Sequence, residues 1–230
     1  MKPGKMTFTV LAVILFTSCF TLSPAVAENV ITSGTKLILS SGTRLISIEN
    51  MVVKSGATLS NAGTLILNKN LTNENAAANS IGTGTAEFSG TINQSISGQN
   101  IFQNLTIKNA TGVTIGGNTS VNGILTLTTG IVTLGSNNLL LGNSATIAGT
   151  PSAAAMIVAT GTGELRKGFV PGFTGSFLFP LGDATGTAEY SPVTLTFNGG
   201  TFGAGNYAGV KLSNSAYPGL TGNFLKRGVK

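Results

Sequence analysis

Apolar residues alternate with polar ones in short segments along most of this chain. Examples are "TKLILSSG", "GTLILNKN", "NLTIKN" and "GILTLTTG", which are rich in Thr, Ile, Val and Leu and are bounded by Gly or Asn. A period of two is typical of a strand with one buried face, whereas a helix repeats its apolar residues every three or four positions. No segment has a convincing helical period. The pattern therefore predicts an all-β protein.

The apolar pairs also recur at a longer period. The interval from Leu45 to Leu65 is the same as the interval from Leu105 to Leu125. Self-similarity at this spacing, roughly 20 residues, is typical of a solenoid in which each coil stacks on the preceding one. We predict a parallel β-helix-like solenoid, with residues 30–166 forming about six coils of ~20–22 residues each.

This fold assigns a direction to each side chain of a strand. Leu125 and Leu127 are expected to face the core, and Thr126 and Thr128 the solvent. Gly and Asn are expected at the corners, where a positive φ is needed. An antiparallel β-sandwich would also fit the regular turn spacing.

The composition changes near residue 160. Seven of the 12 Phe and all three Tyr lie beyond it. We predict a β-solenoid over 28–160 and a small separate β module over 161–230. Residues 74–80 ("ENAAANS") are expected to form a loop that leaves the solenoid. In that module the residues expected to point inward are Phe177, Phe179, Val193, Leu195 and Phe197.

Residues 1–27 have the pattern of a signal peptide. Lys2 and Lys5 precede an apolar run, and "SPAVA" ends it with small residues. Cleavage after Ala27 would start the mature chain at Glu28. The alternative is a lipoprotein anchored through Cys19, the single cysteine of the chain. No later segment has the roughly 20 apolar residues of a membrane-spanning helix.

Charge is sparse outside this segment. Without Lys2 and Lys5 the chain keeps 11 basic residues against 7 acidic ones, a net charge of +4. Three of the basic residues lie within the last five positions. Nucleic-acid binding needs clustered Lys and Arg, so we do not expect it.

Several blocks carry a family resemblance. They are "GTAEFSGTINQSISGQNIFQNLTIKN", "GVTIGGNTSVNGILTLTTGIVTLGSNNLLLG", "GTGELRKGF" and "FPLGDATGTAEYSPVTLTF", which span most of residues 84–227 in the matching order. They resemble stretches of large secreted β-repeat surface proteins of the Bacteroidetes, which are exported by the type IX route. The resemblance implies a cell-surface, adhesin-like and non-catalytic role and transfers no catalytic residue. Such proteins usually end in a sorting domain, so the resemblance implies that this chain is a fragment without that domain.

Candidate chemistry is limited by residue type. The absence of His excludes imidazole as base or metal ligand, and Cys19 is expected to be removed. A glycan lyase or hydrolase on a β-helix would need paired carboxylates, but Glu49, Glu74 and Glu87 do not share one stacked position. We therefore predict no enzyme activity, no catalytic, cofactor-binding or metal-binding residues, and no cofactor.

Weaker motifs have structural interpretations. Asp183 and Glu189 could share an ion, but Asp183 is better explained as stabilising a turn after Gly182. The close glycines of "GTGELRKG" and "GTGTAEFSG" are interpreted as solenoid corners. The N-x-[ST] triplets at the following positions are attributed to chance: Asn70, Asn93, Asn104, Asn109 and Asn118.

These observations predict a secreted or outer-surface structural protein. Its outward Thr, Asn, Ser and Gln side chains would suit glycans or other cell-surface polymers, and a glycan-active β-helix enzyme is the alternative. The module over 161–230 is expected to be truncated, with a strand edge near 193–197 unpaired and prone to aggregation.

Overall fold

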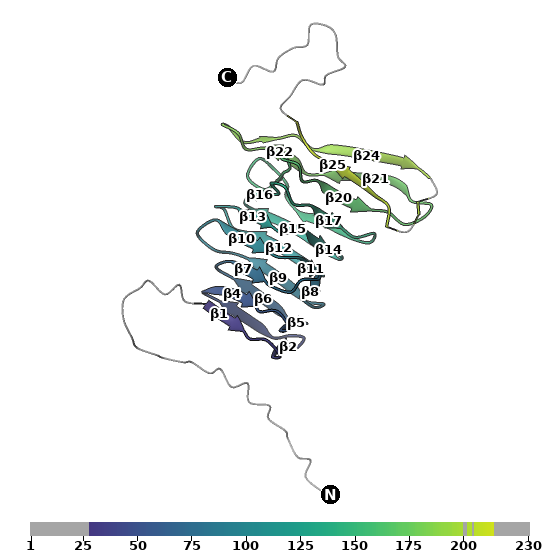
Figure 1. The fold of residues 1–230 in the computed structure, drawn as a ribbon. Helices are drawn as coiled ribbons and strands as arrows, with labels where there is room; N and C mark the ends of the chain where they lie inside the picture. The colour runs from purple at the N-terminus through teal and green to yellow at the C-terminus, as the bar shows by residue number, and fades with distance from the viewer. Residues whose placement is uncertain (1–27, 200–201, 204, 214–230) are drawn as a thin grey trace, which may run out of the picture.

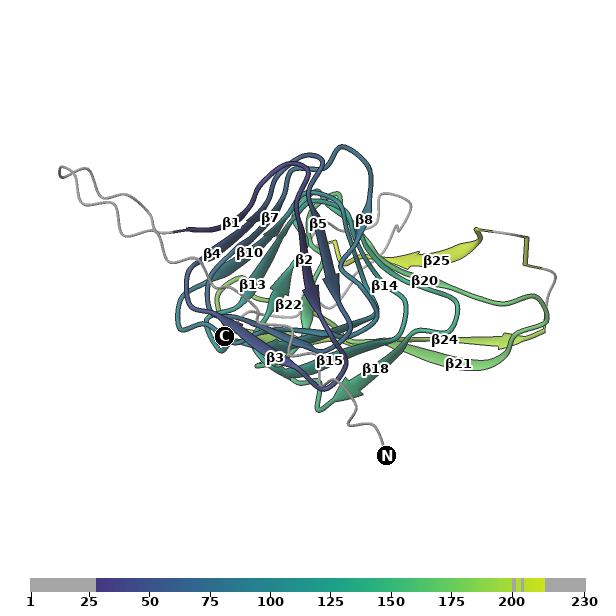
Figure 2. The same ribbon diagram turned by 90° about the horizontal axis from the view of Figure 1, so that it is seen from below.

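The computed structural model describes residues 28–199, 202–203 and 205–213, and all of its regular structure is β. The predicted signal peptide, Cys19 and residues 214–230 lie outside the described residues. Short strands stack into a solenoid that runs from β1 at one end to β22 near the other (Figure 1). Viewed along its axis, the solenoid has three sides (Figure 2). Its predicted class, a parallel β-solenoid, is confirmed.

Each coil contributes one strand to each side. The first side consists of β1 (Glu28–Ile31), β4 (Asn50–Val53), β7 (Leu71–Asn73), β10 (Gln94–Ser97), β13 (Val113–Gly116), β16 (Val132–Thr133), β19 (Ile157–Val158) and β22 (Leu181–Asp183). The second consists of β2 (Lys36–Leu39), β5 (Thr58–Asn61), β8 (Asn79–Ser80), β11 (Asn100–Phe102), β14 (Thr119–Val121), β17 (Leu139–Leu141) and β20 (Leu165–Gly168). The third consists of β3 (Arg44–Ser47), β6 (Thr64–Leu67), β9 (Thr85–Phe88), β12 (Asn104–Lys108), β15 (Ile124–Thr129) and β18 (Thr146–Gly149).

The stack has about seven coils rather than the six predicted. The length of a coil varies, as two pairs of residues on adjacent coils show. Ile96 and Ile115 are closer in sequence than Leu139 and Leu165. Insertions at the corners absorb this variation, since a corner, unlike a strand, does not need a fixed length. The two pairs that indicated the repeat are confirmed, since Leu45 lies opposite Leu65 and Leu105 opposite Leu125.

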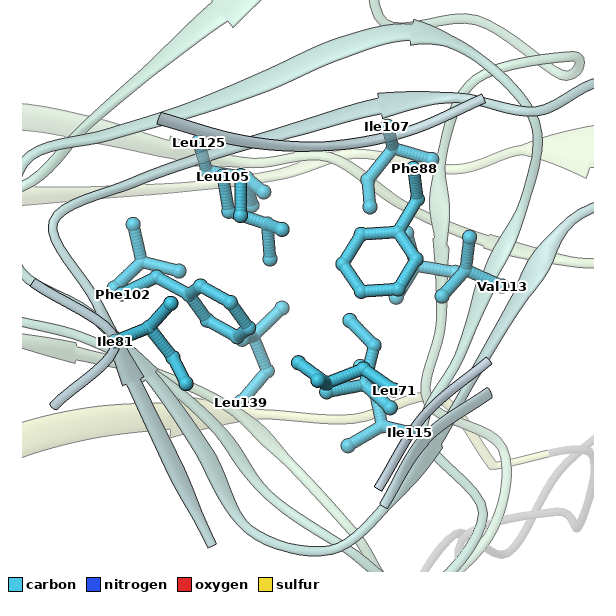
Figure 3. Close-up of a cluster of buried hydrophobic side chains, with 14 of the residues drawn as sticks. Leu71, Ile81, Phe88, Phe102, Leu105, Ile107, Val113, Ile115, Leu125 and Leu139 are labelled. Carbon is cyan, nitrogen blue, oxygen red and sulfur yellow. The ribbon is translucent and has the colours of Figure 1, made fainter. Parts of the chain in front are cut away.

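Inward side chains form one continuous apolar core. Leu125 and Leu127 are fully buried, whereas Thr126 is half-buried and Thr128 is exposed, as predicted. Figure 3 shows side chains from all three sides meeting in the middle of the coils. Phe88 and Phe102 meet there edge to face, with ring centroids 6.5 Å apart. Burial of this row of aliphatic and aromatic side chains stabilises the stack, at about 25 cal/mol per Å² of apolar surface.

The predicted loop at residues 74–80 is confirmed only in part. Residues 74–78 form no strand, but Asn79 and Ser80 form β8 and pair with β11. The loop therefore belongs to a corner between the first and second sides.

Parallel stacking continues past the boundary predicted at residue 160. β20 pairs in parallel with β17, and β22 pairs in parallel with β19. The first residues of the predicted module thus extend the solenoid, because their apolar side chains continue its core rows.

Antiparallel strands follow at this end of the stack. β23 (Glu189–Tyr190) pairs with β22, and β25 (Tyr207–Val210) pairs with β20. β24 (Val193–Asn198) pairs with β21 (Thr174–Phe179) along its whole length. The two form a two-stranded sheet, so among the described residues the other edge of β24 has no strand partner, as expected for an unpaired edge near 193–197. The residues predicted to point inward are buried or half-buried, and Phe169 packs against several of the neighbouring Phe rings. These strands form a cap over the last coil.

Candidate functional site

The outer faces of the solenoid carry pairs of uncharged polar side chains from adjacent coils. On the third side, Thr106 lies opposite Thr126. On the first side, Thr114 lies opposite Thr133, and Thr72 lies opposite Ser97. Because parallel strands are about 4.8 Å apart, each pair places two hydroxyls at that distance along the axis. Parts of the outer faces therefore offer closely spaced hydrogen-bonding groups.

Asparagine side chains connect successive coils at the corners. Asn50 Oδ1 accepts a hydrogen bond from the backbone N–H of Asn70, at 3.2 Å, and Asn70 Oδ1 accepts one from Ser95, at 2.8 Å. Asn104 Oδ1 accepts one from Ile124 in the next coil, at 3.1 Å. This role was not predicted from the sequence, although Asn50 and Asn70 are separated by the same interval as Leu45 and Leu65, a signal that could have indicated it.

Buried amides satisfy the backbone at other corners. The Nδ2 of Asn109 donates to Ile92 O and to Gln94 Oε1, and Gln94 Nε2 donates to Leu67 O and Lys69 O. A buried backbone carbonyl without a donor would cost about 1–3 kcal/mol. The N-x-[ST] asparagine at 109 is thus an internal structural residue.

The three glutamates considered for glycan chemistry are not brought together. Glu87 lies on the outer face of β9, opposite Ile66 and Thr106. Glu49 forms an ion pair with Lys69, and Glu74 forms one with Lys54. The hydrogen bond to Glu74 raises the pKa of Lys54. The structure places the carboxylates of Glu49 and Glu74 beside lysines of the adjacent coil.

Asp183 stabilises a turn, as predicted. Its Oδ1 accepts a hydrogen bond from the backbone N–H of Thr185, at 2.8 Å, which is an Asx-turn. Asp183 also lies opposite Glu189 across β22 and β23. Over the described part of the chain, no group of three or more Asp, Glu, His or Cys side chains is close enough together to hold a metal ion.

The paired glycines at the start of the two weak motifs lie at corners, as predicted, whereas Gly168 is the last residue of β20. Gly84 packs on the backbone of Gly63 in the preceding coil, and Gly163 packs on that of Asn137. A side chain at either position would overlap the neighbouring carbonyl. These glycines therefore allow close stacking of the coils.

Lys167 has an unusual environment on β20. It is 4% exposed, and its ammonium donates to Gly142 O, Asn143 O and Gly168 O at 2.6–2.9 Å. Its Nζ also lies 5.4–5.5 Å from the ring centroids of Phe169 and Phe177. Burial lowers the pKa of Lys167 to about 8. Because the three donors of an ammonium match three carbonyls, Lys167 ties β20 to the corner after β17.

A cleft of about 490 Å³ lies beside Lys167, between β18 and β21. β18 is the last strand in the sheet of the third side, and β21 pairs with β24 instead. The parallel stacking of the third side therefore ends here. Its lining includes Ser144, Ile147, Lys167, Phe173, Phe177 and Leu178. The donors of Lys167 are already occupied by carbonyls, which leaves mainly apolar surface in the cleft.

A second depression lies on the outer second side, where β25 joins the stack. It has a volume of about 260 Å³. We call it the Tyr207 groove, and its lining includes Asn118, Ser120, Asn138, Leu140, Arg166 and Tyr207. The lining residues lie on or next to β14, β17, β20 and β25, which are consecutive strands of one sheet (Figure 1). The groove combines an aromatic ring, amides, a hydroxyl and a guanidinium.

The Tyr207 groove was not predicted from the sequence. Tyr207 and Arg166 are distant along the chain, and only the antiparallel pairing of β25 with β20 brings them together. Asn118 and Asn138 are separated by the interval of the apolar repeat, which gave the only sequence signal for this site.

No protein-family model matches the chain, and no curated protein or solved structure is significantly similar to it. In the described residues no helix is long and apolar enough to cross a membrane.

Proposed function

We propose that this chain is a secreted or outer-surface protein without catalytic activity, a structural or adhesin-like scaffold that presents an extended polar β surface to glycans or other cell-surface polymers. The observation that carries the proposal is the pairing of outward hydroxyl side chains on adjacent coils, such as Thr106 opposite Thr126 and Thr114 opposite Thr133. A solenoid suits this role because each added coil lengthens the binding surface without altering the core.

Two further features support the proposal. The acidic side chains of Glu49 and Glu74 form ion pairs with lysines of an adjacent coil, which leaves them poorly placed as an acid–base pair. The resemblance to secreted β-repeat proteins of the Bacteroidetes also favours a surface protein exported by the type IX route. Residues 1–27 are proposed as its signal peptide, with lipidation of Cys19 as the alternative.

Binding and turnover assays on the same polysaccharides test the proposal. The purified 28–230 chain is incubated with galactomannan, xyloglucan and polygalacturonate. We expect it to be retained by at least one of them without releasing reducing ends or forming unsaturated uronates. Release of either product would favour the alternative, a glycan lyase or hydrolase. Absence of retention on all three would contradict glycan binding.

A further inference from the structure

The Tyr207 groove has the chemistry of a sugar-binding site. We propose that it binds a single neutral sugar unit of a glycan, with the ring of Tyr207 as the stacking surface and the amides of Asn118 and Asn138 as hydrogen-bond donors. This inference rests on the proposed function and assigns it to one place on the molecule.

Tyr207 offers an aromatic surface whose position is fixed. Its side chain is on the outer face of β25, and the residue is 47% exposed. The Cζ of Arg166 lies 4.4 Å from the ring centroid, so the guanidinium covers one face of the ring. The apolar C–H face of a pyranose can pack on an aromatic ring, and Tyr suits such a site because it combines an apolar ring with a polar end.

A glycine makes room for this arrangement. Gly209 lies opposite Arg166 on β25. A Cβ at this position would lie 2.6 Å from Glu164 Oε2 and 3.4 Å from the Tyr207 ring. Because Gly209 has no side chain, Glu164 and Tyr207 can both occupy the space next to Arg166.

Hydrogen bonds to the backbone orient the amides of Asn118 and Asn138 before any ligand binds. Asn118 Oδ1 accepts a hydrogen bond from the backbone N–H of Asn138, at 2.9 Å, and Asn138 Oδ1 accepts one from Glu164, at 3.0 Å. Since both oxygens accept from the backbone, the orientation of each amide is set. Asn138 Nδ2 also donates to Asn118 Oδ1, at 3.5 Å, which leaves its second N–H for a ligand. Donors held in place in this way lower the entropy cost of binding.

The charge and the size of the groove select the ligand class. Arg166 Nε donates to Glu164 Oε2 at 2.9 Å, so the two charges compensate each other. An anionic sugar would therefore gain little from Arg166. The volume of about 260 Å³ is below the ~300–1,000 Å³ typical of sites for drug-sized ligands. Both properties favour one neutral sugar ring, with the rest of the glycan extending over the polar face.

Affinity electrophoresis of the 28–230 chain tests the site. The probes are galactomannan and xyloglucan as neutral glycans and polygalacturonate as the anionic one. Tyr207→Ala should weaken binding to a neutral glycan about tenfold or more, whereas Tyr207→Phe should keep it within about threefold, because stacking is retained. Tyr190→Ala, the same change on β23 of the cap, should bind as the wild type does. A melting temperature is measured for each variant.

A blocking variant covers the case in which Tyr207→Ala does not fold. Ser120→Trp would fill the groove from β14 without removing a packed side chain, and it should abolish binding. If wild type binds a neutral glycan and neither folded variant weakens it, the site is wrong and the proposed function stands. Binding confined to polygalacturonate would overturn the choice of a neutral sugar. Absence of binding to all three probes would overturn both proposals.

Discussion

Side-chain direction within a strand decides which residues hold this protein together. Leu127 is completely buried on β15, while Thr126 next to it is half-buried on the outer face. The two positions are adjacent in the chain, but a period of two places them on opposite sides of the sheet.

The first prediction compares these neighbours. Leu127→Asp places a carboxylate in an apolar core with no partner, which costs several kcal/mol, so we expect an unfolded or insoluble product. Thr126→Asp should remain folded, with a far-UV circular dichroism spectrum like that of wild type. Equal solubility and equal thermal midpoints for the two variants would contradict the observed directions of the side chains on β15.

The second prediction concerns Lys167 and pH. Its pKa is about 8 in the fold, lowered by burial from an ordinary value of 10.5. Between these two values the unfolded chain binds more protons than the folded one, so the contribution of Lys167 to stability rises as pH increases through that window. The urea midpoint of wild type, relative to that of Lys167→Met, should therefore rise from pH 8 to pH 10.

Lys167→Met provides the control because all other titrating groups are shared. At pH 7 it should be less stable than wild type by about 1–3 kcal/mol, since Gly142 O, Asn143 O and Gly168 O lose a donor. Parallel pH dependence in the two proteins would show that Lys167 does not titrate in this range.

At the scale of elements, the corners set how closely the coils approach. Asparagine oxygens accept backbone N–H groups of the next coil, as at Asn70 and Ser95. Glycines at other corners let two backbones touch. The strands supply the apolar core, but the corners determine the distance and register between coils.

The third prediction separates close approach from backbone strain at two glycines. Gly98 and Gly42 both have φ of 78°, in the left-handed region that disfavours side chains. A Cβ at Gly98 would overlap the backbone of Asn73 in the preceding coil, whereas one at Gly42 meets nothing within 4 Å. Gly42→Ala should cost about 1–2 kcal/mol for its φ alone. Gly98→Ala should cost clearly more and lower the thermal midpoint further.

The matching φ makes Gly42→Ala the internal reference for this comparison. Similar thermal midpoints for the two alanine variants would mean that the coils can separate at no cost, and the corner would then not be a tight contact.

At the scale of the whole molecule, the two ends of the stack differ. β22 and β20 are each followed by an antiparallel partner, β23 and β25. β1, β2 and β3 lie at the other end of their sheets, and Ile38 and Ile46 on that first coil are 56% and 49% exposed. Of the described residues, none adds an antiparallel strand to this end. The antiparallel cap therefore makes one end of the solenoid different from the other.

The fourth prediction concerns the start of the mature chain. "SPAVA" before Glu28 predicts cleavage after Ala27, so the exported protein should have an intact mass that corresponds to residues from Glu28 onward. Mass spectrometry of exported protein measures this directly. An acylated N-terminus at Cys19 would instead establish the lipoprotein alternative.

The sequence by itself was sufficient to predict the all-β class, the parallel solenoid and the direction of the side chains on β15. These features follow from the period of two within a strand and from the recurrence of apolar pairs at a similar interval between strands, both of which are local or regular properties of the chain. Turn chemistry was also readable, because Asp183 needs only the nearby Thr185 to form its hydrogen bond.

Only the tertiary structure decided the number of coils, the continuation of the stack beyond residue 160 and the pairing of the cap. Insertions at corners make the interval between paired strands longer at Leu139 and Leu165 than at Ile96 and Ile115. The number of coils therefore cannot be obtained by dividing the sequence by one fixed period. The Tyr207 groove likewise depends on β25 reversing direction to pair with β20, which brings Tyr207 onto Arg166. Antiparallel pairing between distant segments leaves no periodic signal, because its register depends on packing against the neighbouring coil.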